Sequence, residues 1–184
     1  MEDIQAITAI HHPVRRRIVD HLGLYGASQV TALARALEQQ VGSISHHLRM
    51  LERAGVVERA DAPDADRRTS WWKQARRSFT WSADDFEDSP SAALLAREAE
   101  RTNISTQLRR LKHWHSTKSQ RPDPEWSRAA FSTDTIAWAT PDELAALSEA
   151  LRETLESWRA GIDTEDGAAR RPVFVFAHGF PTTP

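Results

Sequence analysis

Residues 42–59 read GSISHHLRMLERAGVVER, and this stretch decides how the first half of the chain folds. Ile44, Leu48 and Leu51 recur at helical spacing, which predicts one buried face of a helix. Gly55 is a typical residue at a helix end, and the VVER that follows has the composition of a β-strand. The stretch therefore predicts a helix that stops at a glycine and leads into a strand.

The opposite face of this predicted helix is polar. Hydroxyl, amide, imidazole and guanidinium groups near a helix start suit base edges and phosphates in the DNA major groove, and a helix N-terminus itself favours an anion. A solvated polar face is the plainer interpretation of the same residues. The candidate DNA-contacting side chains on this face are Gln40, Ser43, Ser45, His46 and Arg49.

The two adjacent histidines do not suggest a metal site. Neighbouring residues on a helix point about 100° apart, whereas helical metal pairs are spaced i, i+4. His47 follows Ile44 by three positions, so we expect it at the edge of the core. His113 and His115 diverge in the same way, and the chain has no cysteine. We expect no metal, no cofactor and, since no nucleophile–base pattern is visible, no catalytic residue and no enzyme.

The residues around this stretch predict two further helices and a hairpin. One helix begins at Pro13 and buries Val14, Ile18 and Leu22, and a second spans TALARALEQQ at 31–40. The strand VVER, a polar turn-rich segment and the strand-like TSWWKQA then predict a β-hairpin with a long loop. Three helices followed by a hairpin are typical of a winged helix-turn-helix.

The second half predicts long helices and a small sheet. Ser89-Pro90 predicts the start of a helix that extends to about residue 116, and Thr140-Pro141-Asp142-Glu143 predicts a capping box. We expect a linker at 120–126 and two strands, 131–139 and 173–177, that pair with each other. The predicted fold class is α+β and mainly helical: an N-terminal winged helix-turn-helix domain at 1–82, then a helical dimerisation or effector domain at 83–184 with long helices and a two-stranded sheet.

Composition and charge narrow the class of protein. Residues 1–82 carry 12 Lys and Arg against 9 Asp and Glu, whereas residues 83–184 carry 12 against 17. If the protein binds a polyanion, we therefore expect the first half to bind it. The chain shows no secretory signal and no apolar run long enough to span a membrane, which predicts a cytoplasmic protein. The many tryptophans of the second half fit either core and interface anchors or the lining of an effector pocket, and both alternatives stay open.

Three motifs resemble those of arsenical-resistance-repressor (ArsR) type winged-helix transcriptional regulators, over roughly residues 8–80. They are HHPVRRRIVDHL at the first helix, SISHHL on the third, and LERAGVV before the hairpin. The resemblance implies a homodimer that binds a palindromic operator on double-stranded DNA through the third helix. It also implies that Arg67 and Arg68, near the hairpin tip, meet phosphates or a minor groove. This chain lacks the cysteine pair of metal-sensing members.

The resulting hypothesis is a dimeric DNA-binding repressor, and the alternative is a winged-helix module that binds protein and not DNA. In the first, Arg15 and Arg16 join the other arginines in neutralising phosphates. The long helix at 90–116 joins two protomers. We expect its contribution to the dimer interface to come from Leu94, Ile104, Leu108, Leu111 and Trp114.

Overall fold

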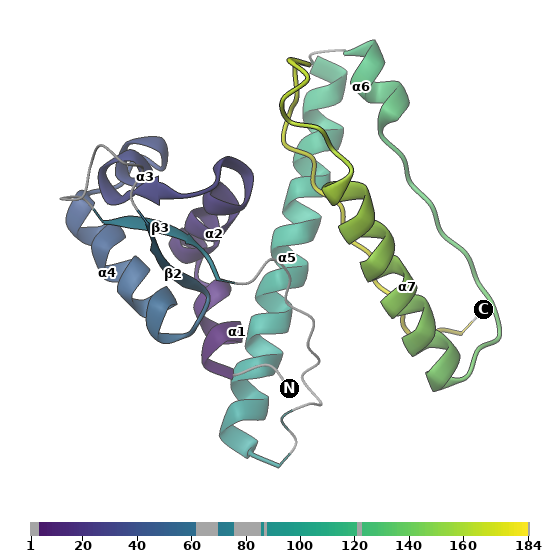
Figure 1. The fold of residues 1–184 in the computed structure, drawn as a ribbon. Helices are drawn as coiled ribbons and strands as arrows, with labels where there is room; N and C mark the ends of the chain where they lie inside the picture. The colour runs from purple at the N-terminus through teal and green to yellow at the C-terminus, as the bar shows by residue number, and fades with distance from the viewer. Residues whose placement is uncertain (1–3, 62–69, 76–85, 87, 121–122, 184) are drawn as a thin grey trace. The chain divides into compact units, whose positions relative to one another are not determined.

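The structure, a computed structural model, describes residues 4–61, 70–75, 86, 88–120 and 123–183. Within these residues it is mainly helical, with one small antiparallel sheet (Figure 1). By its contacts the chain divides into two compact units, residues 1–114 and 115–184. The division falls inside the longest helix, whereas the predicted domain boundary near residue 82 lies in the segment 76–85, outside the described residues.

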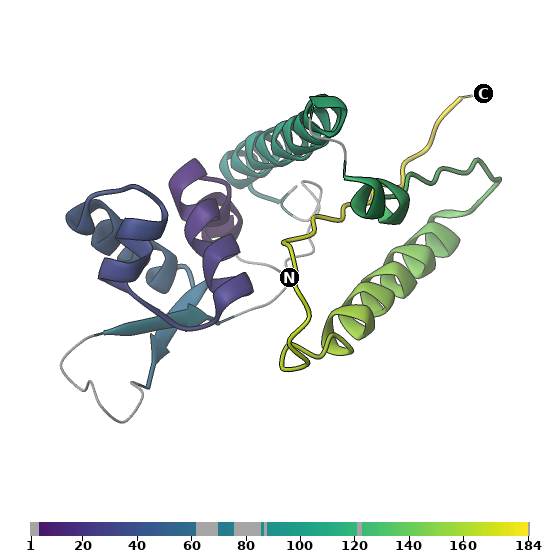
Figure 2. The same ribbon diagram turned by 90° about the horizontal axis from the view of Figure 1, so that it is seen from above.

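The first unit contains a helix-turn-helix and a three-stranded sheet. The helices of this half are α1 (Ile4–Ile10), α2 (Pro13–Tyr25), α3 (Val30–Ala36) and α4 (Val41–Arg53). The strands are β1 (Ser28–Gln29), β2 (Val57–Ala60) and β3 (Trp71–Gln74), in the order β1-β3-β2. The hairpin β2–β3 projects from the helices as a wing (Figure 2). The predicted winged helix-turn-helix architecture is therefore present.

The core of this unit forms where the sequence predicts it. Ile44, Leu48 and Leu51 on α4 are fully buried, as are Ile18 on α2 and Leu33 on α3. Their burial stabilises the unit by roughly 1.5–3 kcal/mol per side chain. These residues belong to one continuous hydrophobic cluster, which fixes α4 against α2 and α3.

The sheet is anchored to this core by Trp72. This residue is 2% exposed and lies at the centre of β3, opposite Ser28 on β1 and Arg59 on β2. The Arg59 guanidinium lies 3.9 Å from the centre of the Trp72 ring, within cation–π range. The strands of the wing are therefore anchored to the hydrophobic core.

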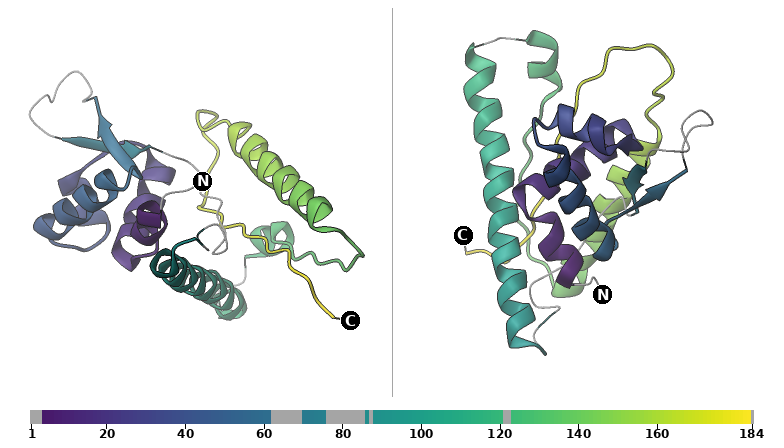
Figure 3. Two further views of the ribbon diagram at one scale, coloured as in Figure 1. Left: turned by 90° about the horizontal axis from the view of Figure 1, so that it is seen from below. Right: turned by 90° about the vertical axis from the view of Figure 1, so that its left-hand side faces the viewer.

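Helix α5 (Pro90–Gln120) begins as predicted and is longer than predicted. Ser89 caps it, with the Ala92 amide 3.5 Å from the Ser89 hydroxyl. In the first unit its buried positions are the small residues Ala93, Ala96 and Ala99, and Figures 1 and 3 show α1 beside this part of the helix. Helix α1 was not predicted, although Ile4, Ile7 and Ile10 follow a helical repeat.

The second unit contains α6 (Pro124–Ala129) and α7 (Pro141–Ala160). The predicted capping box of α7 is present: the Glu143 amide donates to the Thr140 hydroxyl, and the Thr140 amide donates to the Glu143 carboxylate at 2.7 Å. Residues 124–129 are helical where a linker is predicted at 120–126, because Asp123 caps a short helix that starts at Pro124.

The predicted two-stranded sheet of the second half is wrong. Residues 131–139 and 173–177 carry no strand in the structure and are mostly exposed, Trp138 to 98%. Their aromatic and β-branched residues suit a strand, but a strand forms only against a partner and a buried face, and neither segment has them here.

No described helix of the chain is both long and apolar enough to cross a membrane.

Candidate nucleic-acid interface

The predicted recognition surface lies on α4, above the three buried anchors. Gln40, His46 and Arg49 are exposed, and Ser43 and Ser45 are half-buried at the edges of the same face. The Arg49 Nε donates to the Ser45 carbonyl oxygen at 3.3 Å, which holds the base of this side chain along the helix. The structure thus brings all five predicted residues together on one accessible surface, called here the α4 ridge.

The start of α4 is open to an anion. Gln40 is the N-cap residue, its side chain makes no capping hydrogen bond, and the first turn contains no acidic residue. A helix N-terminus with no carboxylate of its own attracts phosphate through its free amides and its dipole. Val41, not singled out from the sequence, is 48% exposed at the first position of the helix. An apolar side chain there suits a thymine methyl group.

The arginines of α2 have different surroundings. Arg16 forms an ion pair with Asp20 at 3.1 Å, and Arg110 of α5 contacts the same carboxylate. Arg17 donates to the Leu37 carbonyl oxygen at 2.9 Å and so ties α2 to the helix-turn-helix. Arg15 is half-buried, and burial lowers the pKa of its guanidinium. Of the two predicted phosphate contacts on α2, Arg16 is therefore already paired, whereas Arg15 has no acidic partner among the ion pairs of the described chain.

The wing contributes charges that are mostly paired. Lys73 lies 3.2 Å from Glu58 across the hairpin, and Arg59 lies 3.4 Å from Glu52 of α4. These are exposed pairs, worth at most about 1 kcal/mol each. The predicted contacts Arg67 and Arg68 lie outside the described residues.

Histidines from two helices meet beside the α4 ridge. The His12 ring, at the start of α2, lies 4.8 Å from the His47 ring of α4, and His47 lies 5.6 Å from His46. His47 is half-buried, as expected for a residue at the edge of the core. Nothing in the sequence indicated that His12 and His47 are in contact, because 34 residues separate them. In the part of the chain that is described, no three side chains of metal-binding type come together.

The predicted dimer residues on α5 are accessible in the single chain. Leu94 is 70% exposed, and Ile104, Leu108 and Leu111 are 39–45% exposed, whereas Trp114 is half-buried. Ile104, Leu108 and Leu111 form one stripe on the helix, because spacings of four and three residues return to the same face. Leu94 lies ten residues before Ile104, about 2.8 turns, and so lies roughly 80° around the helix from it. A stripe of this kind on one helix is apolar surface available for packing.

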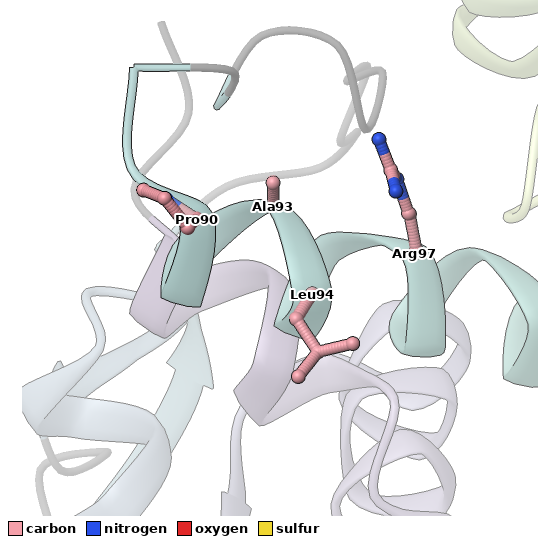
Figure 4. Close-up of a pocket in the computed structure, with 4 residues that line it drawn as sticks. All are labelled: Pro90, Ala93, Leu94 and Arg97. Carbon is pink, nitrogen blue, oxygen red and sulfur yellow. The ribbon is translucent and has the colours of Figure 1, made fainter.

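A surface hollow lies at the start of α5. It is lined by Pro90, Ala93, Leu94 and Arg97 (Figure 4). The Ala93 and Arg97 side chains point to one side of the helix and Leu94 to the other. Ligand sites usually combine an enclosed apolar cavity with several convergent polar groups, and this hollow offers one arginine. It gives no support to an effector site.

Comparison with known proteins identifies the helix-turn-helix. Residues 10–60, which contain α2, α3, α4 and β2, match the family model of a helix-turn-helix domain. Two solved structures of a double mutant of Lactococcus lactis ZitR, one of them in apo form, each share 14% identity with this chain. The alignments cover 80% of this chain and 83% and 75% of the ZitR chains, with TM-scores of 0.37 and 0.36. These scores are too low to indicate a common fold over the whole chain. None of the curated proteins compared has a significant match.

Proposed function

We propose that the protein is a DNA-binding transcriptional regulator that acts in the cytoplasm as a homodimeric repressor. One observation carries the proposal: within the matched helix-turn-helix domain, a polar ridge is exposed on a helix whose opposite face is fully buried. A rigid helix with short polar side chains at its N-terminal half is suited to enter a major groove. The proposal that the protein represses transcription rests on its resemblance to ArsR-type proteins.

In this proposal the α4 ridge reads bases and the arginines hold phosphates. Gln40, Ser43, Ser45 and His46 supply hydrogen bonds to base edges, each good contact contributing about 1–3 kcal/mol of discrimination. Arg49 and Arg15 neutralise the DNA backbone, with Arg16, Arg67 and Arg68 as further cations. Binding therefore weakens as salt increases, because phosphate neutralisation releases counterions.

Dimerisation through α5 supports the same function. Leu94, Ile104, Leu108 and Leu111 expose apolar surface on a 31-residue helix, and a second copy of this helix would cover it. A two-fold dimer places two α4 helices about one DNA turn, ~34 Å, apart and so selects a palindromic operator. A bound effector would act by changing that spacing.

The test begins by selecting, from fragments of the source genome, those that the protein binds. The affinity of the Arg49→Ala variant for one selected duplex is then compared with that of the wild type. We expect Arg49→Ala to weaken binding at least about tenfold in a mobility-shift assay at fixed salt, because a charge-assisted contact is lost.

Arg97→Ala is the matched control, since it removes the same charge from an exposed position on α5. Equal affinities for the wild type and Arg49→Ala would contradict the proposed role of the α4 ridge. If no duplex is enriched, the protein-binding winged-helix module becomes the better hypothesis.

A further inference from the structure

The contact between His12 and His47 joins the start of α2 to the middle of α4. His12 is the N-cap residue of α2, and its side chain makes no capping hydrogen bond. Its ring lies 4.8 Å from that of His47 at an angle of 39°, and Arg15 follows one turn later on α2. His46 of the α4 ridge is the next neighbour, at 5.6 Å from His47. The pair therefore borders the proposed DNA-contacting surface.

Three polar atoms of this cluster are unsatisfied among the described residues. The Nδ1 atoms of His12 and His47 and the Nε of Arg15 are buried and have no hydrogen-bond partner among the described residues. Buried polar atoms in folded proteins are nearly always paired, so such a group calls for a ligand or another explanation. Arg15 is close enough to both rings to lower their pKa values, so the three groups are neighbours. The arginine Nε always donates, and each imidazole Nδ1 donates when it carries the proton, so together they suit an acceptor-only ligand.

The charges around the pair favour an anion. The first turns of α2 and α4 contain no acidic residue. Burial and the Arg15 cation lower the pKa of His12, and burial, His12, Arg15 and His46 lower that of His47. Near neutral pH both rings are therefore uncharged beside a guanidinium. An entering anion would be attracted by Arg15. Its negative charge would stabilise the protonated form of both rings and so raise their pKa values.

We propose that His12, His47 and Arg15 form a phosphate-binding site at the edge of the α4 ridge, and that this site takes up a proton when a DNA phosphate enters it. The inference rests on the proposed DNA binding and assigns two residues, His12 and His47, that the function did not yet use. It makes DNA affinity depend on pH through one defined pair of side chains.

The direction of the effect follows from linkage. A phosphate beside the rings raises their pKa values towards or above the usual 6.5, so the complex binds more protons than the free protein. Affinity then increases as the pH falls through the window between the pKa values of the complex and those of the free protein. One proton gives at most a tenfold change per pH unit. We expect binding about three- to tenfold tighter at pH 6.0 than at pH 7.5.

The experiment uses the full chain and a random-sequence duplex at fixed low salt, with a chelator present to remove metal ions. Affinity is measured by fluorescence anisotropy across the pH range, and calorimetry in two buffers of different ionisation enthalpy counts the protons taken up. The test variant is His12→Gln with His47→Gln, because glutamine keeps a hydrogen-bond donor but does not titrate. Circular dichroism at each pH confirms that it is folded.

The matched control is His21→Gln. His21 is also on α2, burial also lowers the pKa of its imidazole, and it lies against Tyr25 at the other end of the helix. We expect the wild type and His21→Gln to take up about one proton or less and to share one pH dependence. The double variant, whatever its affinity at pH 7.5, should show no gain in affinity at pH 6.0.

Failure of the phosphate-site proposal and failure of the proposed DNA binding give different results. A double variant that keeps the pH dependence, or a wild type that binds without proton uptake, overturns the phosphate site and leaves DNA binding intact. Absence of binding to any duplex at any pH overturns the proposed function itself. Loss of the pH dependence in His21→Gln would also overturn the assignment to His12 and His47.

Discussion

At the residue scale, two residues with positive φ lie on either side of α4. Glu38, in the turn between α3 and α4, has φ of 53°, and Gly55, after α4, has φ of 64°. A side chain in the left-handed region costs about 1–2 kcal/mol, which glycine avoids. The turn thus contains strain at Glu38, whereas Gly55 is the residue that its backbone requires.

We expect Glu38→Gly to raise the free energy of unfolding by about 0.5–1 kcal/mol, since the relieved strain exceeds the extra chain entropy of glycine. Gly55→Ala is the opposite control and should lower it by about 1 kcal/mol, because a Cβ there has open space but an unfavourable φ. Chemical denaturation measures both. A destabilised Glu38→Gly would mean that the Glu38 side chain has a role in the fold.

His11 makes stability depend on pH. Burial, and to a lesser degree the Arg16 cation, lowers the pKa of its imidazole from 6.5 to about 4. Between these values the unfolded chain binds more protons than the folded one, so stability falls as the pH falls from about 6.5 to about 4.

We expect the wild type to lose about 1–2 kcal/mol of stability to this group over that window, after allowing for screening by solvent. His11→Gln should flatten the decline, as measured by urea denaturation at several pH values. His113→Gln, at an exposed position of α5, should leave the slope unchanged. An unchanged slope in His11→Gln would assign the acid sensitivity to other groups.

The α4 ridge and its anchors could be predicted from the sequence, whereas the histidine contact could not. Ile44, Leu48 and Leu51 reveal the buried face because helical periodicity acts over a few residues. His12 and His47 meet only because α2 packs on α4, and periodicity along one helix contains no information about its neighbour.

At the element scale, α7 depends on its cap more than a buried helix would. None of its described residues is buried, so packing contributes little, and the Thr140–Glu143 capping box satisfies its first amides. We expect Thr140→Ala to destabilise the helix by about 1 kcal/mol. Hydrogen exchange of the first-turn amides should speed up about fivefold, and Thr154→Ala, within the same helix, should have a smaller effect there. Unchanged exchange in Thr140→Ala would show that contacts beyond the cap hold α7.

The apolar stripe of α5 gives a prediction about assembly. Leu108→Glu places a charge among Ile104 and Leu111, and burying an unpaired carboxylate costs several kcal/mol. We expect the wild type to be a dimer at micromolar concentration and Leu108→Glu to be monomeric by light scattering. Ser105→Glu adds the same charge at an exposed polar position of α5 and should stay dimeric. A monomeric wild type would remove the argument for a palindromic operator.

The sequence predicted elements well where local signals and burial agree. The caps at Ser89 and Thr140 and the anchors of α4 all correspond to helices in the structure. Residues 131–139 and 173–177 have strand-like composition but are mostly exposed and carry no strand, since strand formation depends on a partner that composition alone does not supply.

At the scale of the whole molecule, the two units differ in how they are stabilised. The first has one continuous core, and the second has no buried residue among those whose side chains the structure describes. On α7, Leu147, Leu151, Leu155 and Trp158 form an exposed apolar stripe. The DNA-contacting surface proposed here therefore belongs entirely to the unit that has a core.

The central claim is that this surface binds the DNA backbone and grooves, and the salt dependence of binding to duplex DNA tests it most directly. We predict that the logarithm of the association constant falls linearly with the logarithm of salt concentration, with a slope of about −4 or steeper for contacts from two protomers. Arg49→Ala should reduce that slope by about 1 to 2, one contact from each protomer. A duplex affinity that does not change with salt, or no measurable affinity at low salt, would contradict the account.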